Sequence, residues 1–385
     1  MANLEADWLF AEATQTVFSL LANAGHAAYA VGGCVRNAIL GEQVNDVDFA
    51  TDAPPARVLE LAKAAGLKTI PTGVLHGTVG VVVEGILQEV TTFRRDVATD
   101  GRRAVVEFSN RIEDAARRRD FTMNALYVDA EGAVFDPLGG RADLEARRVR
   151  FIGDPEARIR EDYLRSLRYF RFHAWYCTSG EGFDREATTA IAANLDGLSG
   201  LSKERVGSEM KRLLSARDPV QAVAAMRSCG VLAAALPGSG DAALGSLVAL
   251  ERGLDVAADP MRRLAVMGGD GLADRLKLSR REAKRLSDVQ RHGETDPGEA
   301  GYRLGAEVAR DAALAACAVA GRQVSAETLE LIERGATQAF PIEAADLLPA
   351  FKGPALGKAL DGLERKWIAS GFELGREELL ALAMG

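Results

Sequence analysis

The stretch AYAVGGCVRNAILGEQVNDVDF, residues 28–49, limits the possible folds more than any other part of the sequence. Apolar residues 28–31 predict a short strand, and the glycine pair at 32–33 interrupts it. A helix is expected over 35–40, because Gly41 suits the left-handed residue that ends many helices. A second strand follows, so the pattern predicts a strand–turn–helix–strand unit.

Two aspartates in this unit predict a metal site. Asp46 and Asp48 are expected on one strand and therefore on the same face of it. Two carboxylates this close repel each other unless a cation lies between them, and their oxygens suit Mg²⁺ with its waters and phosphates. Gly32 and Gly33 let backbone N–H groups approach a phosphate at a helix N-terminus. Solvated acids on a surface turn are the alternative, which the glycine pair disfavours.

Composition limits the rest of the interpretation. A chain of 385 residues predicts two or three domains, and a net charge of −8 means that any RNA contact must use a local basic patch. The four cysteines are far apart and include no CxxC pair, so neither zinc nor disulfides are expected and a reducing cytoplasm fits. No signal pattern or long apolar run predicts a membrane segment.

The N-terminal part is expected to alternate helices and strands. Glu89 lies in one predicted strand as a candidate third metal carboxylate, with a solvated strand acid as an equal alternative. The polar residues 94–105 predict a loop. Helices are expected over 4–24, 54–65 and 112–127, and strands over 67–70, 78–83, 86–93, 125–128 and 133–135.

The C-terminal part is expected to be helical. Asp154-Pro155 starts a helix that is predicted to run to about Tyr176. At about 100° per residue, Asp162 and Arg165 fall on one polar face of this helix. A surface ion pair is the simpler explanation of these two side chains. From residue 201 onward the apolar spacing is helical throughout.

Four motifs together resemble the class II nucleotidyltransferases, which comprise tRNA CCA-adding enzymes and bacterial poly(A) polymerases. They are GGCVR with DVD, RRDFTMNAL at 118–126, DPLGG at 136–140 and EDYLR at 161–165. Each is weak alone, but their order across residues 28–210 is highly specific. The resemblance implies an α+β fold: a polymerase-beta-like head with a mixed sheet at 1–145, a helical neck at 146–210 that carries a nucleotide-base template, and a helical body and tail at 211–385 that bind tRNA.

The resemblance also implies an activity. A CCA-adding enzyme adds CCA to the 3′ acceptor end of tRNA from CTP and ATP, releases pyrophosphate and uses Mg²⁺. Asp46 and Asp48 would hold two metal ions, with Glu89 as a further catalytic candidate. The implied nucleotide-binding residues are Gly32, Gly33, Arg36, Arg119, Asp120, Asp162, Arg165, Arg168 and Arg171. The helical wheel places Arg171 opposite Asp162, so Arg171 has a structural alternative.

The base template has a simple chemistry. Cytosine and adenine both present an exocyclic amine beside an acceptor ring nitrogen, so Asp162 would accept from the amine and Arg165 would donate to the ring nitrogen. Uracil and guanine place a carbonyl where the amine was. A mismatch of buried polar groups discriminates by up to ~10⁴-fold.

Other interpretations stay open at this point. The chain carries Asn37 where the family usually has Asp. A poly(A) polymerase shares the head, although residues 71–78 look more like CCA enzymes, and loop 94–105 resembles the one associated with terminal A addition, which argues against a CC-only enzyme. An RNA-binding protein with a degenerate head and a small-molecule nucleotidyltransferase are the remaining alternatives.

Overall fold

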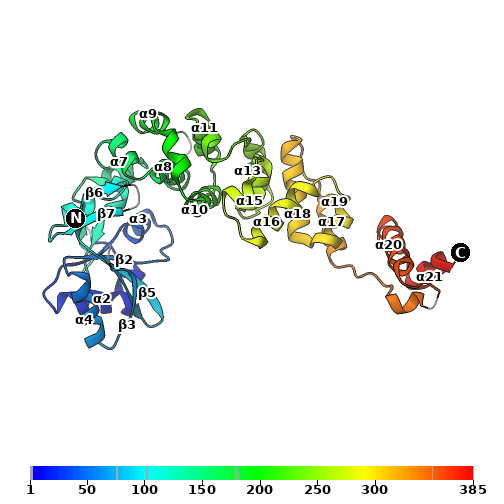
Figure 1. The fold of residues 1–385 in the computed structure, drawn as a ribbon, viewed down its shortest axis with the longest axis horizontal. Coiled ribbons are helices and arrows are strands. Elements are labelled where there is room, and N and C mark those ends of the chain that lie inside the picture. The colour runs from blue at the N-terminus through cyan, green and yellow to red at the C-terminus, as the bar shows by residue number, and fades with distance from the viewer. Residues whose placement is uncertain are drawn as a thin grey trace. The chain divides into compact units, whose positions relative to one another are not determined.

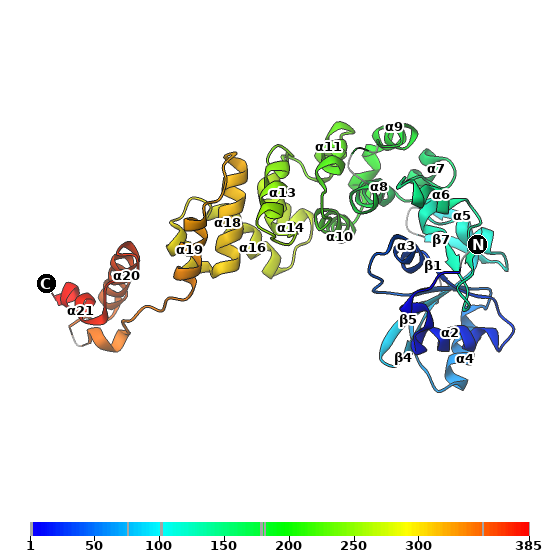
Figure 2. The ribbon, with the colours of Figure 1, turned by 180° about the vertical axis from the view of Figure 1, so that it is seen from behind.

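The computed structural model describes residues 3–74, 77–100, 103–177, 180, 182–348 and 350–384. The chain forms two compact units (Figures 1 and 2). The first unit runs to Val206 and takes in Ser228–Ala235, and the second unit comprises Gly207–Arg227 and the chain from Leu236 onward. Residues 75, 76, 101 and 102, within two stretches used above, lie outside the described residues.

A mixed sheet forms the centre of the first unit. Its strand order is β3-β4-β5-β2-β1-β8-β9, with β2 parallel to β5 and the other neighbours antiparallel. The strands are β1 (Ala28–Val31), β2 (Asp48–Thr51), β3 (Lys68–Gly73), β4 (Thr78–Val83), β5 (Ile86–Thr92), β8 (Tyr127–Val128) and β9 (Val134–Phe135). The predicted α+β class is confirmed.

Helices α2 (Glu12–Ala22) and α4 (Pro55–Ala64) contact each other and pack against strands of this sheet. Helix α3 (Gly33–Leu40) follows β1 and contacts it (Figure 1). Phe18 of α2 meets Phe49 of β2 edge to face at 5.0 Å, and both are buried. A short helix, α1 (Asp7–Phe10), precedes α2, so the predicted helix over 4–24 is interrupted.

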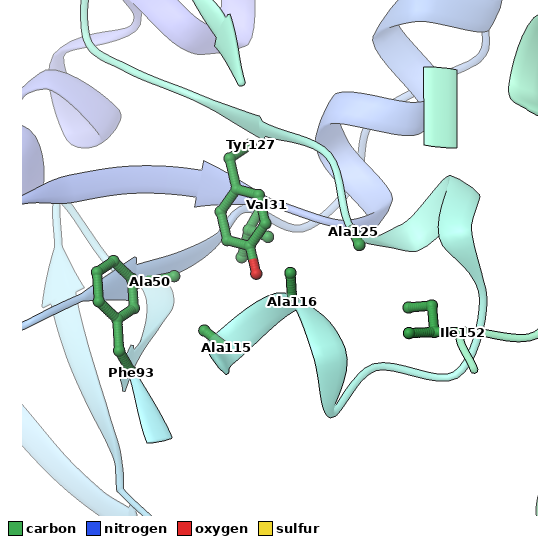
Figure 3. Close-up of a cluster of buried hydrophobic side chains, with 8 residues drawn as sticks. All are labelled: Val31, Ala50, Phe93, Ala115, Ala116, Ala125, Tyr127 and Ile152. Atoms are coloured by element: carbon green, nitrogen blue, oxygen red, sulfur yellow. The ribbon is translucent and has the colours of Figure 1, made fainter. Parts of the chain in front are cut away.

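Helix α5 (Ile112–Arg117) packs against the sheet through small residues. Ala115 and Ala116 contact a buried cluster that includes Val31, Phe93 and Tyr127 (Figure 3). Alanine side chains let the helix backbone come close to the strands, and each of these five residues is at most 3% exposed. Burying apolar surface in this way contributes about 25 cal/mol per Å². The end of α5 is therefore fixed beside β1.

Two predicted elements of this region are wrong. Residues 94–105 are part of a β-hairpin, β6 (Arg94–Asp100) with β7 (Arg103–Phe108), and not a plain loop. Arg95 of β6 and Glu107 of β7 form a cross-strand ion pair at 2.7 Å. The predicted helix over 112–127 ends at Arg117, and only a short 3-10 helix, η2 (Thr122–Asn124), follows.

The predicted helix over 155–176 is also wrong as one element. It is broken into α7 (Pro155–Glu161) and α8 (Leu164–Tyr176). Asp162 is extended, with φ −156° and ψ 102°, and its carboxylate accepts the backbone N–H of Leu164 at 3.2 Å. Such local side-chain bonds compete with helix continuation, which explains the break.

The remaining elements of the chain are helical. They are α6 (Gly140–Glu145), α9 (Arg185–Ala193), η3 (Leu195–Gly200), α10 (Lys203–Leu214), α11 (Val220–Ser228), α12 (Val231–Ala235), α13 (Leu244–Gly253), α14 (Pro260–Met267), α15 (Leu272–Arg275), α16 (Arg280–Arg291), α17 (Pro297–Leu304), α18 (Ala306–Val319), α19 (Ala326–Ala336), η4 (Ala344–Leu347), α20 (Pro354–Ala369) and α21 (Arg376–Met384). Among the described helices, none is long and apolar enough to cross a membrane. The domain limits at 145 and 210 stay predictions.

Two kinds of contact stabilise the second unit: buried ion pairs and close helix packing at glycines. A buried ionic cluster joins Arg262 to Asp311 at 2.6 Å and Arg263 to Glu251 at 2.6 Å, with each side chain at most 3% exposed. Close glycine contacts join α17 and α19, because a Cβ on Gly301 would lie 2.1 Å from a backbone oxygen of α19. Removing one partner of a buried ion pair costs about 3–5 kcal/mol, so loss of any member of the cluster should destabilise this unit.

Candidate active site

The turn between β1 and α3 leaves a helix N-terminus open. Gly32 has φ +79°, and a Cβ there would lie 2.8 Å from Nη1 of Arg119, so only glycine fits without strain. No side chain caps the start of α3. The first backbone N–H groups of a helix lack partners within it, and the helix dipole favours an anion there.

Acidic residues gather beside this turn. Asp48 is the first residue of β2, and it pairs in register with Glu89 of the parallel strand β5, so both side chains lie on one face. Asp46 precedes the strand and does not lie within it, contrary to the sequence prediction. Asp48 keeps an exposed surface, but the protein packed around its carboxyl partly desolvates it and raises its pKa. The Arg119 charge lowers this pKa, and the smaller effects of Glu89 and Asp46 raise it.

Arg119 lies across the turn from these acids. Its guanidinium carbon is 5.8 Å from the ring centre of Tyr127, and its Nη1 lies beside Gly32. Its Nε is buried without a hydrogen-bond partner among the described residues. A cation is thus held between an open helix N-terminus and a cluster of carboxylates, which suits a polyphosphate bridged to a metal ion.

Arg36 is buried and not open to solvent. It donates to Oδ1 of Asn124, to the hydroxyl of Tyr176 at 2.7 Å and to Oδ1 of Asn37 at 2.9 Å, and it is 7% exposed. Burial lowers its pKa. The Asn37 amide donates to the carbonyl oxygen of Gln43 at 2.8 Å, so the departure from the family Asp ties α3 to the loop before Asp46.

Asp120 is a buried anion with a complete set of partners. Its Oδ2 accepts from Nε of Arg168 at 2.7 Å, and its Oδ1 accepts from Asn124 at 3.0 Å and the backbone of Phe121 at 2.9 Å. Burial alone would raise the pKa of Asp120, but the Arg168 charge and these hydrogen bonds lower it to about 2. Its carboxylate is engaged here, whereas Glu89 faces Asp48.

Asp162 and Arg165, the two proposed template residues, do not share a helix face and do not pair with each other. Asp162 lies in the break between α7 and α8 and accepts from Arg205 at 2.6 Å. Arg165, in the first turn of α8, donates to Glu161 at 2.6 Å and to the Arg158 carbonyl oxygen at 2.7 Å. The prediction of one exposed helix face is wrong, because the two residues belong to different elements and each has its own partner.

The sequence did not single out some of these partners. Glu161 lies in the EDYLR motif, which implies no role for it, and Arg205 and Arg158 are helical arginines with no spacing signal. Arg171 lies 4.6 Å from the ring centre of Phe172. Long-range pairs such as Arg205 with Asp162 depend on the tertiary fold and leave no local pattern.

The donor set fits a hard cation. Asp46, Asp48 and Glu89 offer only oxygen ligands. Desolvation is the main cause of the raised pKa of Asp48, and the charges of Glu89 and Asp46 add a smaller repulsion that a cation would relieve. The described residues contain no ready cluster of three or more His, Cys, Asp or Glu side chains around one point. The oxygens of a nucleotide and water would have to complete the coordination, which is the arrangement Mg²⁺ commonly adopts.

Comparison with known proteins places these features in a family. Residues 28–150 match the family described as "Poly A polymerase head domain", and residues 182–241 match "Probable RNA and SrmB- binding site of polymerase A". The mitochondrial CCA tRNA nucleotidyltransferase 1 of Mus musculus is 32% identical over 97% of this chain and 90% of its own length. A CCA-adding enzyme of Geobacillus thermodenitrificans is 42% identical over 56% of this chain and 52% of its own length.

Solved structures agree. The Bacillus stearothermophilus CCA-adding enzyme in complex with CTP has a TM-score of 0.79 and 29% identity, covering 97% of this chain and 96% of that one. The Thermotoga maritima CCA-adding enzyme complexed with tRNA shares the fold, with a TM-score of 0.69 and 19% identity, covering 100% of this chain and 98% of that one. This chain therefore belongs to the CCA tRNA nucleotidyltransferase family.

Proposed function

We infer that the protein adds CCA to the 3′ end of tRNA, transferring nucleotidyl groups from CTP and ATP with release of pyrophosphate. One observation carries this assignment: the acids around Asp48 face Arg119 across an uncapped helix N-terminus in a chain of this family. The tRNA 3′ oxygen attacks the α-phosphorus of the nucleotide and loses its proton. The bond between the α-phosphorus and the oxygen that bridges to the β-phosphorus breaks, and pyrophosphate leaves with that oxygen. The chain is a nucleotidyltransferase, and enzymes of its family are metal-dependent.

We propose that the metal is Mg²⁺ and that Asp46 and Asp48 hold two such ions, with Glu89 as an additional carboxylate. When bound, the metal supplies activation of the 3′ hydroxyl and neutralises phosphate charge. The support is the all-oxygen donor set and the raised pKa of Asp48. Asp120 fits this role less well, since its carboxylate is paired with Arg168.

The triphosphate is proposed to lie over Gly32 and Gly33. Backbone N–H groups at the start of α3 and the Arg119 guanidinium supply positive potential there. The Arg36 guanidinium donates to Asn124 and Tyr176, and through these bonds it holds α3 in place. Contact of Arg36 with phosphate would require exchange of these bonds, as is proposed for Asp162 and Arg165.

Base recognition is proposed for Asp162 and Arg165, with Arg168 and Arg171 nearby. Asp162 presents an acceptor and Arg165 a set of donors, the pattern that complements cytosine and adenine. In the structure both side chains have protein partners, Arg205 and Glu161. Binding of a nucleotide would exchange these ion pairs for hydrogen bonds to the base.

Two further proposals concern the cellular location of the protein and its domain organisation. Since all four cysteines are free, a reducing cytoplasm is kept as the proposed location. A head over 1–145, a neck over 146–210 that carries the template and an RNA-binding body and tail over 211–385 are kept as the proposed organisation.

A poly(A) polymerase is the alternative with specific support, because the head family bears that name. Incubation with ATP and an unstructured RNA separates the two activities. A CCA-adding enzyme should leave this RNA unextended while it extends tRNA that lacks its terminal A. Long adenosine tails on the unstructured RNA would favour the alternative.

A further inference from the structure

Arg158 of α7 bonds to the backbone that carries Arg119. Its side chain is largely buried, and its Nη2 donates to the carbonyl oxygens of Arg118 and Arg119 at 2.7 and 2.6 Å. Its Nη1 pairs with Glu161. One side chain therefore connects the helix before the template to the residues that follow α5.

The two carbonyl groups need such a donor. They lie just beyond Arg117, the last residue of α5, where backbone oxygens lack helical partners and the helix dipole is negative. A guanidinium presents several N–H groups in one plane and serves two acceptors together, which a lysine ammonium matches poorly. Arg158 is thus suited to fix the direction in which the chain leaves α5.

The position of Arg119 depends on that direction. Its Nη1 lies beside Gly32, and its charge lowers the pKa of Asp48 against the neighbouring acids. Its Nε has no hydrogen-bond partner among the described residues, so this end of the side chain is not anchored by a bond of its own. The backbone at 118–119 sets where the Arg119 side chain begins, so its direction limits where the guanidinium can lie.

Arg165 contacts Glu161 and Arg118, as Arg158 does. Its Nη1 donates to the carbonyl oxygen of Arg158 and to Glu161, and its Nη2 lies 3.4 Å from the Arg118 carbonyl oxygen. Glu161 balances Arg158 and Arg165, which face each other. The side of the site that is proposed to read the base and the side that is proposed to hold phosphate therefore meet at Arg158.

We propose that Arg158 is a positioning residue for nucleotide addition: it fixes the backbone of residues 118–119 so that the Arg119 guanidinium is held at the triphosphate. The inference rests on the proposed function, and it assigns Arg158 no contact with the nucleotide. It predicts that loss of Arg158 weakens recognition of the phosphates and leaves recognition of the base largely intact, because the Arg158 carbonyl oxygen that holds Arg165 remains in any substitution.

Steady-state kinetics with R158M and R158K test this role. The control is R160M, which changes an exposed arginine of the same helix that pairs with Glu156. R158M should raise KM for CTP and ATP about tenfold and lower kcat up to ~10²-fold, as expected for a displaced charge, with the preference for C and A over U and G retained. R158K should fall between, and R160M should match the wild type. A purely structural role predicts a smaller active fraction with unchanged KM.

Binding of tripolyphosphate by calorimetry gives a readout that does not depend on turnover. The wild type and R160M should bind it with equal affinity, and R158M about tenfold more weakly. Circular dichroism shows whether each variant is folded; if R158M is not, R158K decides the question. Unchanged KM and unchanged tripolyphosphate affinity in a folded Arg158 variant would overturn the proposal. Absence of nucleotide addition by the wild type would refute the proposed function, and the binding comparison would still test Arg158.

Discussion

At the scale of single residues, the site is defined by charges that have no simple partner. Desolvation and, to a smaller extent, neighbouring acids raise the pKa of Asp48, and Arg119 keeps a buried Nε without a hydrogen bond among the described residues. Both conditions are unfavourable in an isolated protein, and a metal ion with a polyphosphate would relieve both. These two residues are therefore the ones whose replacement is most informative.

Replacement of Asp48 should abolish catalysis and spare the fold. D48A or D46A should lower nucleotide incorporation at least ~10³-fold, since metal positioning fails. Glu42 is an exposed acid of the same loop, and E42Q is expected to behave as the wild type. Single-turnover incorporation of CTP measures the effect, with circular dichroism as the check on folding. Near-normal turnover in D46A or D48A would contradict the metal assignment.

Asp120 should make the stability of the head depend on acid. Its pKa is about 2 in the folded protein, below the ordinary value of 3.8, so its contribution is complete above about pH 4 and is lost as pH falls toward 2. The linked stabilisation is about 2–3 kcal/mol. Urea unfolding of the wild type and D120N should differ most near pH 6, and the gap should shrink between pH 4 and 2. A gap independent of pH would show that the charge of Asp120 does not matter.

At the scale of elements, the sequence predicted the strands, turns and helices that are set by local residue patterns. The β1 strand, the Gly32 turn, α3 and the strands β4 and β5 were found close to their expected positions. Two of the failures involve contacts that helical periodicity does not report, some of them between residues distant in sequence. The hairpin β6–β7 is joined by Arg95 and Glu107, and the break at Asp162 accompanies a bond to Arg205. Helical periodicity alone cannot show either contact.

The break between α7 and α8 gives the template residues separate roles that variants can distinguish. D162A removes the acceptor and its repulsion against a carbonyl, so use of CTP and ATP should fall while exclusion of UTP relaxes. R165A should weaken both correct nucleotides without admitting UTP. A structural ion pair predicts unchanged nucleotide choice and a loss of stability within ~1 kcal/mol. Single-turnover incorporation of each of the four nucleotides decides between these outcomes.

At the scale of the whole molecule, charge limits how RNA can bind. The chain carries a net charge of −8, so contact with tRNA must use local cations. Lys277, Arg280 and Arg281 lie within five residues of one another and are exposed. The charge of Arg281 also acts on Glu307. The tail lysines Lys352 and Lys358 are the other candidates, and both are exposed.

Salt dependence of tRNA affinity measures these contacts. Changing Lys277, Arg280 and Arg281 to glutamine should weaken binding and reduce the slope of log affinity against log salt by about 0.7–0.9 per lost phosphate contact. The pair K352Q and K358Q tests the tail in the same way. R57Q, on an exposed arginine of α4 that pairs with Glu60, is the control. If neither set of substitutions changes the slope of log affinity against log salt, tRNA binds elsewhere on the protein.

Stepwise nucleotide addition tests the central claim most directly. The purified protein is incubated with Mg²⁺ and tRNA that lacks its CCA end, and products are resolved at single-nucleotide length. CTP alone should extend the tRNA by two nucleotides, ATP alone should not extend it, and both together should extend it by three. UTP and GTP should give no product. Extension by ATP alone, continued addition beyond three, or no addition under any condition would contradict the assignment of this chain as a CCA-adding enzyme.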